Sequence, residues 1–357
     1  MIDSLFDGSA SDAELACLAT SAEREITKYL AAEHFAFAAS GLIALQAALY
    51  AAGVRQGAEV VCDGLFPFAI MATLNLGACP VIADIDDDSL TMSPASLGAV
   101  ITSTTQAVIC TAACGVPPSS EDLRLVMGAR SRAVLIEDHA QAFGARIDGR
   151  AAGGAADLIA LSFQKGKLLS CGAGGGVVSR CVEQIVAARQ YLELGWHPRE
   201  RDGAPDWQSG WRLREPLCQS GRLSDIAAAL LLARLPEYDA ARVERIEAVR
   251  RLKSALGSQL PWARQQQAPP GFDDHRWRVA LICPSAAAAE ELVLALGAKG
   301  SLAYRQAGPP PAEWPAFRER VSRGRASRTA DLYTRMVLVP SGSVEDADRE
   351  AGAVLCL

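Results

Sequence analysis

Short apolar runs recur through the first half of the chain, each bounded by turn residues or acids. They lie at residues 59–63, 80–84, 107–111, 133–137, 158–163 and 175–179. Most are separated by stretches long enough for a helix. This alternation is typical of βαβ units, so we predict an α/β fold with a mainly parallel sheet and helices on both faces. In such sheets, ligands bind at the carboxyl ends of the strands.

The pattern changes after residue 191. Residues 192–216 are polar and irregular and contain three tryptophans, which predicts a long loop, either a surface excursion or a flap over a site. A long helix follows from Leu223, with a break or kink expected at Pro236. Later apolar runs predict a strand, a helix and another strand. We therefore predict a large domain over 1–235 and a smaller C-terminal α+β domain over 236–357.

Composition and charge narrow the class of protein. Half of the 357 residues are hydrophobic and 21% are charged, which indicates a globular chain. The net charge of −6, without a basic run, argues against nucleic acid or an anionic membrane as a partner. Residues 35–54 are uncharged over roughly a bilayer's length. Because Ser40-Gly41 and Gln46 interrupt them, we expect a short strand or turn feeding a buried helix instead of a membrane span.

The ten cysteines lie mostly in apolar segments and form no CxxC pair. The N-terminus carries acids where a signal peptide carries bases, so we expect reduced cysteines in a cytoplasmic protein. Cys110 and Cys114 have a metal-pair spacing but no neighbouring histidine or cysteine. No metal site is expected.

Several residues at predicted strand ends suit pyridoxal phosphate (PLP). This cofactor needs a lysine for its Schiff base, an acid beside its ring nitrogen and a phosphate cradle at a helix N-terminus. Ser40-Gly41 lie where a strand turns into a helix, and Asp138 directly follows an apolar run. Ser162 closes another strand, and Lys167 comes five residues later. Taken singly, each has a simpler explanation; Asp138, for example, suits a helix N-cap.

Together these segments resemble the DegT/StrS sugar aminotransferase family, a branch of the fold-type I PLP-dependent enzymes. The likeness rests on SGLIAL (40–45), EDHAQAFGA (137–145), SFQKGKLLSCGAGG (162–175) and QSGRLSDIAAA (219–229). It implies a large domain with a seven-stranded sheet, PLP as cofactor and a homodimer with sites at the subunit interface.

The resemblance also implies a role for each matching residue. Lys167 would form the Schiff base and then move a proton, and Asp138 would pair with the ring nitrogen. Pyridoxamine 5'-phosphate would carry the amino group between substrates. The other cofactor contacts would be Ser40, Gly41, Leu42, Phe66 (or Phe68), Gln141, Ser162 and, across the subunit interface, Ser220.

Four positions depart from the family's pattern. Leu42 replaces a threonine, Ser220 an asparagine and Ala173 an acid, while His139 stands where a small residue is usual. His139 is either a partner of Asp138 or the substrate, or a packed histidine. We expect Lys165 to be a surface lysine and Arg222 to be structural. Loop arginines (Arg199, Arg201, Arg212 and Arg214) and Tyr304-Arg305 either meet an anionic substrate or are solvated.

The resemblance implies an aminotransferase that moves nitrogen from glutamate or glutamine to a keto sugar, nucleotide-linked or not, or to a related cyclic ketone. Two other readings stay open. One is a PLP-dependent lyase, decarboxylase or condensing enzyme, and the other is a non-catalytic homologue acting as a partner subunit.

Overall fold

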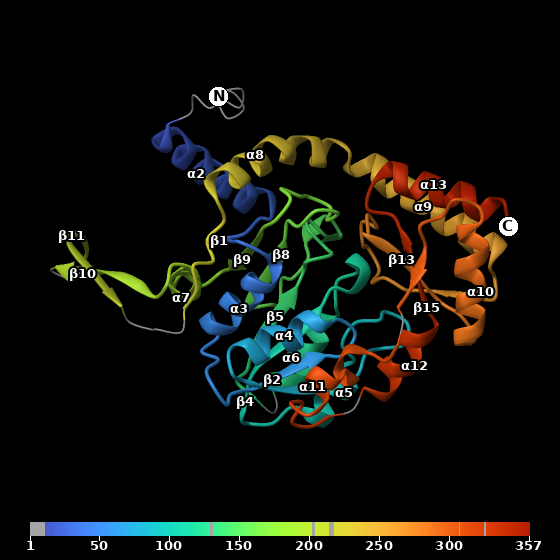
Figure 1. Ribbon diagram of the computed structural model, residues 1–357, viewed down its shortest axis with the longest axis horizontal. Coiled ribbons are helices and arrows are strands. Elements are labelled where there is room, and N and C mark those ends of the chain that lie inside the picture. Colours follow the sequence, from blue (N-terminus) through green and yellow to red (C-terminus); the bar gives the residue numbers. More distant parts are fainter. Residues whose placement is uncertain (1–10, 129–130, 202–203, 214–217, 307, 325) are drawn as a thin grey trace.

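The computed structural model describes residues 11–128, 131–201, 204–213, 218–306, 308–324 and 326–357, with the backbone alone over 196–213. Helices and strands alternate along most of this part of the chain and build two main sheets (Figure 1).

The larger sheet has seven strands in the order β1-β9-β8-β5-β4-β2-β3. Strand β9 is antiparallel to both of its neighbours, and the other pairs are parallel. The predicted seven-stranded, mainly parallel sheet is confirmed. The strands are β1 His34–Ala38, β2 Glu59–Asp63, β3 Cys79–Ala83, β4 Thr105–Thr111, β5 Val134–Asp138, β8 Leu158–Ser162 and β9 Gly175–Ser179.

Helices cover both faces of this sheet because successive strand side chains point to opposite sides. Val60 and Cys62 of β2 share one core with α3, α4 and α7, whereas Val61 shares another with α5 and α6. The first three helices are α3 Gly41–Ala51, α4 Pro67–Asn75 and α7 Val182–Leu192. The other two are α5 Pro94–Val100 and α6 Ser120–Gly128.

Helix α3 explains the uncharged stretch noted in the sequence. This helix is buried along most of its length, which explains why its own residues are apolar on nearly every face. Among the described residues, no helix is both long enough and apolar enough to cross a membrane.

Two long helices lead from the large sheet to the smaller one. Helix α8 (Asp225–Ala240) packs beside α2 (Asp12–Tyr29) and extends past Pro236, and α9 (Arg242–Gln259) begins two residues after α8 ends. A second core then forms among α9, α10 (Ala286–Gly297) and α13 (Val344–Leu355). The domain boundary at residues 235 and 236 stays a prediction.

The smaller sheet is antiparallel, with the order β12-β13-β15-β14. Its strands are β12 Arg264–Gln265, β13 Arg278–Ile282, β14 Tyr304–Arg305 and β15 Met336–Pro340. It confirms the strand–helix–strand pattern predicted in this part of the chain. A separate short hairpin, β6 (Arg146–Ile147) and β7 (Arg150–Ala151), follows β5.

One segment of the C-terminal third returns to the large sheet, which the sequence did not predict. It contains a 3-10 turn at Pro311–Glu313, α11 (Pro315–Arg318) and the start of α12 (Ser327–Arg335). Phe317 and Val321 pack against the core beside α3 and α4, and the Ile82 N–H donates to the carbonyl of Arg323 (3.0 Å). This segment therefore covers the β3 edge of the large sheet.

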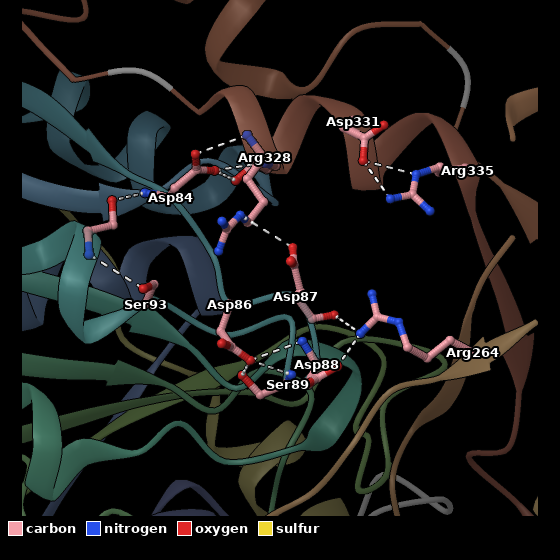
Figure 2. Close-up of polar contacts among 12 residues, drawn as sticks. Asp84, Asp86, Asp87, Asp88, Ser89, Ser93, Arg264, Arg328, Asp331 and Arg335 are labelled. Carbon is pink, nitrogen blue, oxygen red and sulfur yellow. Dashed lines mark hydrogen bonds and ion pairs between the residues drawn. The ribbon is translucent and has the colours of Figure 1, made fainter. Parts of the chain in front are cut away.

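An acidic loop after β3 joins these parts of the molecule (Figure 2). Asp84 accepts hydrogen bonds from the backbone N–H groups of Arg328 (3.0 Å) and Thr329 (2.7 Å) at the start of α12. Asp88 pairs with Arg264 of β12, and Asp87 lies 3.4 Å from Arg328. Three carboxylates of this loop, those of Asp84, Asp87 and Asp88, thus pair with groups of the C-terminal third.

The tryptophan-rich segment is not the irregular loop that we predicted. It forms an antiparallel hairpin of β10 (Trp196–Arg201) and β11 (Ala204–Leu213), which extends away from the large sheet beyond α7 (Figure 1). The prediction was wrong because the polar composition of this segment does not reveal that its backbone pairs as two strands. Of the loop arginines named above, Arg214 and the side chains of Arg199, Arg201 and Arg212 lie outside the described residues.

Candidate active site

Polar side chains gather where the central parallel strands end. Asp63, Thr111 and Asp138 are the last residues of β2, β4 and β5, which are neighbours in the sheet. Thr111 lies in register with Asp138, and its N–H donates to Asp63 Oδ2 (2.8 Å). The carboxyl edge of this sheet, where ligands of such folds bind, therefore carries two buried carboxyl groups.

Asp138 is buried, and one of its carboxylate oxygens accepts a backbone hydrogen bond. Its Oδ1 accepts the N–H of Ala140 (2.9 Å). Burial raises the pKa of Asp138, and the Ala140 N–H and the charge of Lys167 oppose that rise. The aspartate is therefore placed to be stabilised by a cation.

Gln141 lies just beyond Asp138 and is also buried. Its Oε1 accepts the N–H of Cys114 (3.0 Å), in the 3-10 turn Ala113–Gly115 that follows β4. Because the oxygen is occupied, the amide nitrogen is the end of this side chain that can donate to a ligand.

The N-terminus of α3 lies directly against the end of β8. A Cβ built on Gly41 would lie 2.8 Å from Cβ of Ser162, and one built on Gly175 only 2.5 Å from the carbonyl oxygen of Ser40. Ser40 caps the helix by accepting the N–H of Ile43 (3.2 Å). The structure thus brings the predicted Ser40-Gly41 and Ser162 together, and small residues make that approach possible.

Lys167 lies on the turn after β8, with its side chain half-buried. Burial lowers the pKa of Lys167 to about 8, and the charge of Arg278 adds to this effect while Asp138 opposes it. Lys165 is exposed, as the sequence predicted for a surface lysine. Of these two lysines, Lys167 alone lies in the environment that a nucleophilic amine requires.

An aromatic residue just before β13 covers this lysine, and sequence reasoning missed it. Lys167 Nζ lies 3.9 Å from the ring centroid of Trp277, and Trp277 Nε1 donates to the carbonyl of Gly166 (2.7 Å). Arg278 stacks on the same ring, with its Cζ 3.2 Å from the centroid. The one signal in the sequence was a pair of arginines flanking a tryptophan at the start of an apolar strand.

The remaining predicted contacts divide into two groups. Phe66 precedes α4 and packs against a cluster that contains Cys114, whereas Phe68 is 46% exposed; Phe66 is therefore the better placed ring. Leu42 turns toward the core beneath α3, and Ser220 is exposed. The role of Ser220 across a subunit interface stays a prediction.

Other polar candidates are occupied elsewhere. His139 is buried and its Nε2 lies 2.6 Å from Glu137 Oε2, so the packed-histidine reading fits. Arg222 pairs with Asp225 (3.2 Å) and Arg305 with Glu290 (3.0 Å). The described residues include no cluster of three or more His, Cys, Asp or Glu arranged for a metal, and the cysteines are unbridged.

A cavity of about 830 Å³ opens elsewhere, between α2, β1, α7 and α8. Glu23 and Arg189 line it as an ion pair. None of the residues predicted to bind PLP lines this cavity, so the chemistry is assigned to the strand ends.

Together, the sheet topology and the position of Lys167 on the turn after β8 define a fold-type I transferase. The chain belongs to the DegT/DnrJ/EryC1/StrS aminotransferase family, whose sequence model matches residues 18–351.

Named relatives agree with this assignment. The chain is 31% identical over 340 residues to the L-glutamine:2-deoxy-scyllo-inosose aminotransferase of Streptomyces kanamyceticus, covering 89% of this chain and 76% of that protein. The protein of the same name from Streptoalloteichus tenebrarius is 31% identical over 257 residues, or 72% of this chain. That match spans 60% of the relative's own length, which is less than two thirds.

Solved structures support the fold. The crystal structure of 3-amino-5-hydroxybenzoic acid synthase superposes with a TM-score of 0.82 at 23% identity, over 95% of this chain and 90% of that one.

Proposed function

We propose that this protein is a PLP-dependent aminotransferase in which Lys167 binds the cofactor covalently. The observation that carries the proposal is the lysine itself: a half-buried amine with its pKa lowered to about 8, on a turn that faces a buried aspartate at the sheet edge. An ordinary lysine of pKa 10.5 is almost wholly protonated at neutral pH. At a pKa of about 8, roughly a tenth of the amine is neutral at pH 7.

The surrounding residues fit PLP. Asp138 would hold a proton on the ring nitrogen, and a cation beside this carboxyl would offset the burial that raises its pKa. The Gln141 amide nitrogen would donate to the ring hydroxyl, and Phe66 would stack on the ring. The phosphate would lie against Ser162 and the first N–H groups of α3, where the helix dipole favours an anion.

Leu42 stands where the family has a threonine, so the side-chain hydroxyl is missing, but the backbone N–H of this residue is kept. Ser40 accepts the N–H groups of Ile43 and Ala44 through its side chain and its carbonyl. Among the described residues no acceptor bonds to the N–H groups of Gly41 and Leu42, so these remain for the phosphate.

PLP, when bound, supplies an aldehyde for amine exchange and an electron sink for charge that develops at the substrate Cα. With the cofactor bound, Lys167 would serve as the base that removes the proton from that Cα and would deliver a proton to the cofactor's exocyclic carbon. Its lowered pKa suits both directions, because a proton carrier works best when its pKa lies near the working pH.

The substrates follow from the relatives. We propose glutamine or glutamate as the donor and a polyhydroxylated cyclic ketone of the inosose kind as the acceptor, since two relatives carry names of that form. A nucleotide-linked keto sugar is the second acceptor class, as in the sequence-based expectation. We also propose a homodimer in which Ser220 reaches the partner's phosphate site.

The decisive test is covalent trapping. Protein incubated with PLP and reduced with borohydride should carry the cofactor on the peptide that contains Lys167, and the rate of trapping should rise with pH around a midpoint near 8. Lys167→Ala should abolish trapping, whereas the exposed Lys165→Ala should not change it.

Each other outcome points to a different class of protein. Protein that binds no PLP would favour the non-catalytic homologue. Protein that traps PLP on Lys167 but releases carbon dioxide or water from an amino acid, without passing nitrogen to a ketone, would be a lyase.

A further inference from the structure

Arg278 places a second cation beside Lys167. It is the first residue of β13, half-buried, and its guanidinium stacks on Trp277 and lies 5.2 Å from the ring centroid of Tyr304. Among the described residues, no acid lies within ion-pair distance of it and no hydrogen-bond acceptor takes its N–H groups. A guanidinium has five donors, so this side chain has most of its bonding capacity left over.

Neighbouring arginines behave differently. Arg276, two residues earlier, is fully buried and pairs with Asp274 through two nitrogens (2.6 and 2.7 Å). Arg305, next to Tyr304, pairs with Glu290. An arginine that serves packing in this region is therefore matched by an acid, and Arg278 departs from that pattern.

Burial of Arg278 has an electrostatic cost. Removal from water lowers the pKa of Arg278, and its charge in turn helps to lower the pKa of Lys167. A desolvated cation near a second cation is unfavourable unless an anion binds there for part of the cycle.

The geometry matches the size of an amino acid. Lys167 Nζ and Arg278 Cζ lie 3.9 and 3.2 Å from the same ring centroid, so these two atoms are at most about 7 Å apart. In an α-amino acid the nitrogen and the carboxylate carbon are two bonds apart, roughly 2.5 Å. A charge-assisted hydrogen bond adds roughly 3 Å, and the resulting reach lies within that upper limit.

We propose that Arg278 is a specificity residue that binds a substrate carboxylate, with Trp277 and Tyr304 orienting its guanidinium plane. The proposal rests on the proposed function, because it concerns the substrate of that same site. Two sources supply this chemistry: the carboxylate of the amino donor, and a carboxylate on the keto acceptor. Stacking on aromatic faces leaves the edge of the guanidinium for the two-pronged contact that carboxylates favour.

The first experiment needs no turnover. Glutarate, which has carboxylates but no amine, is titrated calorimetrically into the PLP-loaded protein and into Arg278→Met, Arg278→Lys and Arg305→Met. Arg278→Met should weaken binding by about tenfold or more. Arg278→Lys should restore part of it, and Arg305→Met, whose guanidinium is already paired, should match the parent protein.

The second experiment separates the two sources. In single turnovers, absorbance follows the conversion of the bound cofactor by glutamine. The reverse conversion is then measured with two ketones, 2-deoxy-scyllo-inosose and a ring ketone that carries a carboxylate. If Arg278→Met raises the half-saturating concentration of glutamine and leaves the uncharged ketone unaffected, the donor is the source. If only the carboxylated ketone is weakened, the acceptor is the source.

Unchanged glutarate affinity together with unchanged half-saturation in both arms would overturn the proposal. That result is distinct from failure of the proposed function, in which PLP is not trapped on Lys167 at all. Cofactor content and circular dichroism of each variant show that it is folded and loaded, and Arg278→Lys keeps the test valid if the methionine variant does not fold.

Discussion

Asp63 shows how one buried residue ties stability to pH. Its Oδ2 accepts the N–H of Thr111, but among the described residues no group donates a hydrogen bond to its Oδ1. Burial is the main cause that raises the pKa of Asp63 from 3.8 to about 6, and the nearby charge of Asp138 adds to it. A protonated carboxyl is therefore the form that the folded protein accommodates best.

The first prediction concerns Asp63→Asn. Because the pKa of Asp63 is higher in the folded protein than in the unfolded chain, its contribution to stability is complete below pH 3.8 and is lost as the pH rises through 6. The amide keeps the shape without the charge. The free energy of unfolding of the variant, relative to the parent, should therefore rise between pH 4 and pH 7 by up to about 3 kcal/mol. Urea denaturation across this range measures it, and a difference that does not vary with pH would refute the assignment.

At the scale of residues, the sequence predicted those that follow their own strands. Asp138 and Ser162 end apolar runs, and Lys167 comes one short turn later, so the order along the chain already places them at one sheet edge. Trp277 and Arg278 could not be found in this way. Trp277 is 111 residues from Gly166, to which it bonds, and their contact depends on how the small sheet packs against the large one.

At the scale of elements, β9 is constrained by two neighbouring chain segments. A Cβ on Gly175 would lie 2.5 Å from the carbonyl oxygen of Ser40 and 2.7 Å from that of Leu161. Both are backbone atoms, which cannot move aside as a flexible side chain can. The start of α3 therefore keeps its position only while this strand presents glycine.

The second prediction follows from that contact. Gly175→Ala should lower the free energy of unfolding by about 1–3 kcal/mol, because the extra methyl group overpacks the strand. It should also weaken PLP binding, because Ser40 must shift. Gly352→Ala is the control: this glycine is exposed in α13 with nothing near its Cβ, and alanine should stabilise the helix by about 0.5–1 kcal/mol without changing PLP affinity. Thermal melts and PLP titrations measure both effects, and equal behaviour of the two variants would count against the argument.

Sequence patterns predicted the strands of the large sheet better than the connecting segments. Apolar runs bounded by acids and glycines are strong strand signals, and each run overlaps an observed strand. The hairpin of β10 and β11 was missed because its residues are mostly polar. The return of residues 311–323 to the β3 edge was missed because nothing local to that segment encodes its partner.

At the scale of the whole molecule, Asp84 links the large sheet to α12. Its carboxylate accepts three hydrogen bonds, two from backbone N–H groups and one from Thr329 Oγ1 (2.7 Å). The exposed carboxylate of Asp331 on the same helix pairs with Arg335, one turn away (Figure 2). Asp84 therefore joins two separate elements, whereas Asp331 pairs with a residue of its own helix.

The third prediction compares them. Asp84→Ala should cost about 1–2 kcal/mol in the free energy of unfolding, because α12 loses the acceptor at its first turn. It should also increase proteolytic cleavage in residues 311–335. Asp331→Ala should change stability by less than about 0.5 kcal/mol, as for other exposed ion pairs. Similar losses in the two variants, measured by urea denaturation, would show that Asp84 does not join the segments as described.

The indole of Trp277 has one more consequence. It belongs to the small sheet's side of the molecule, yet it covers an amine on the large sheet's side, so contact between the two halves contributes to the desolvation of Lys167. Protonation of the amine and separation of the halves are then linked equilibria, and acid should favour both. Since each pKa unit corresponds to about 1.4 kcal/mol, the titration of a single amine becomes a gauge of how firmly the two halves are held together.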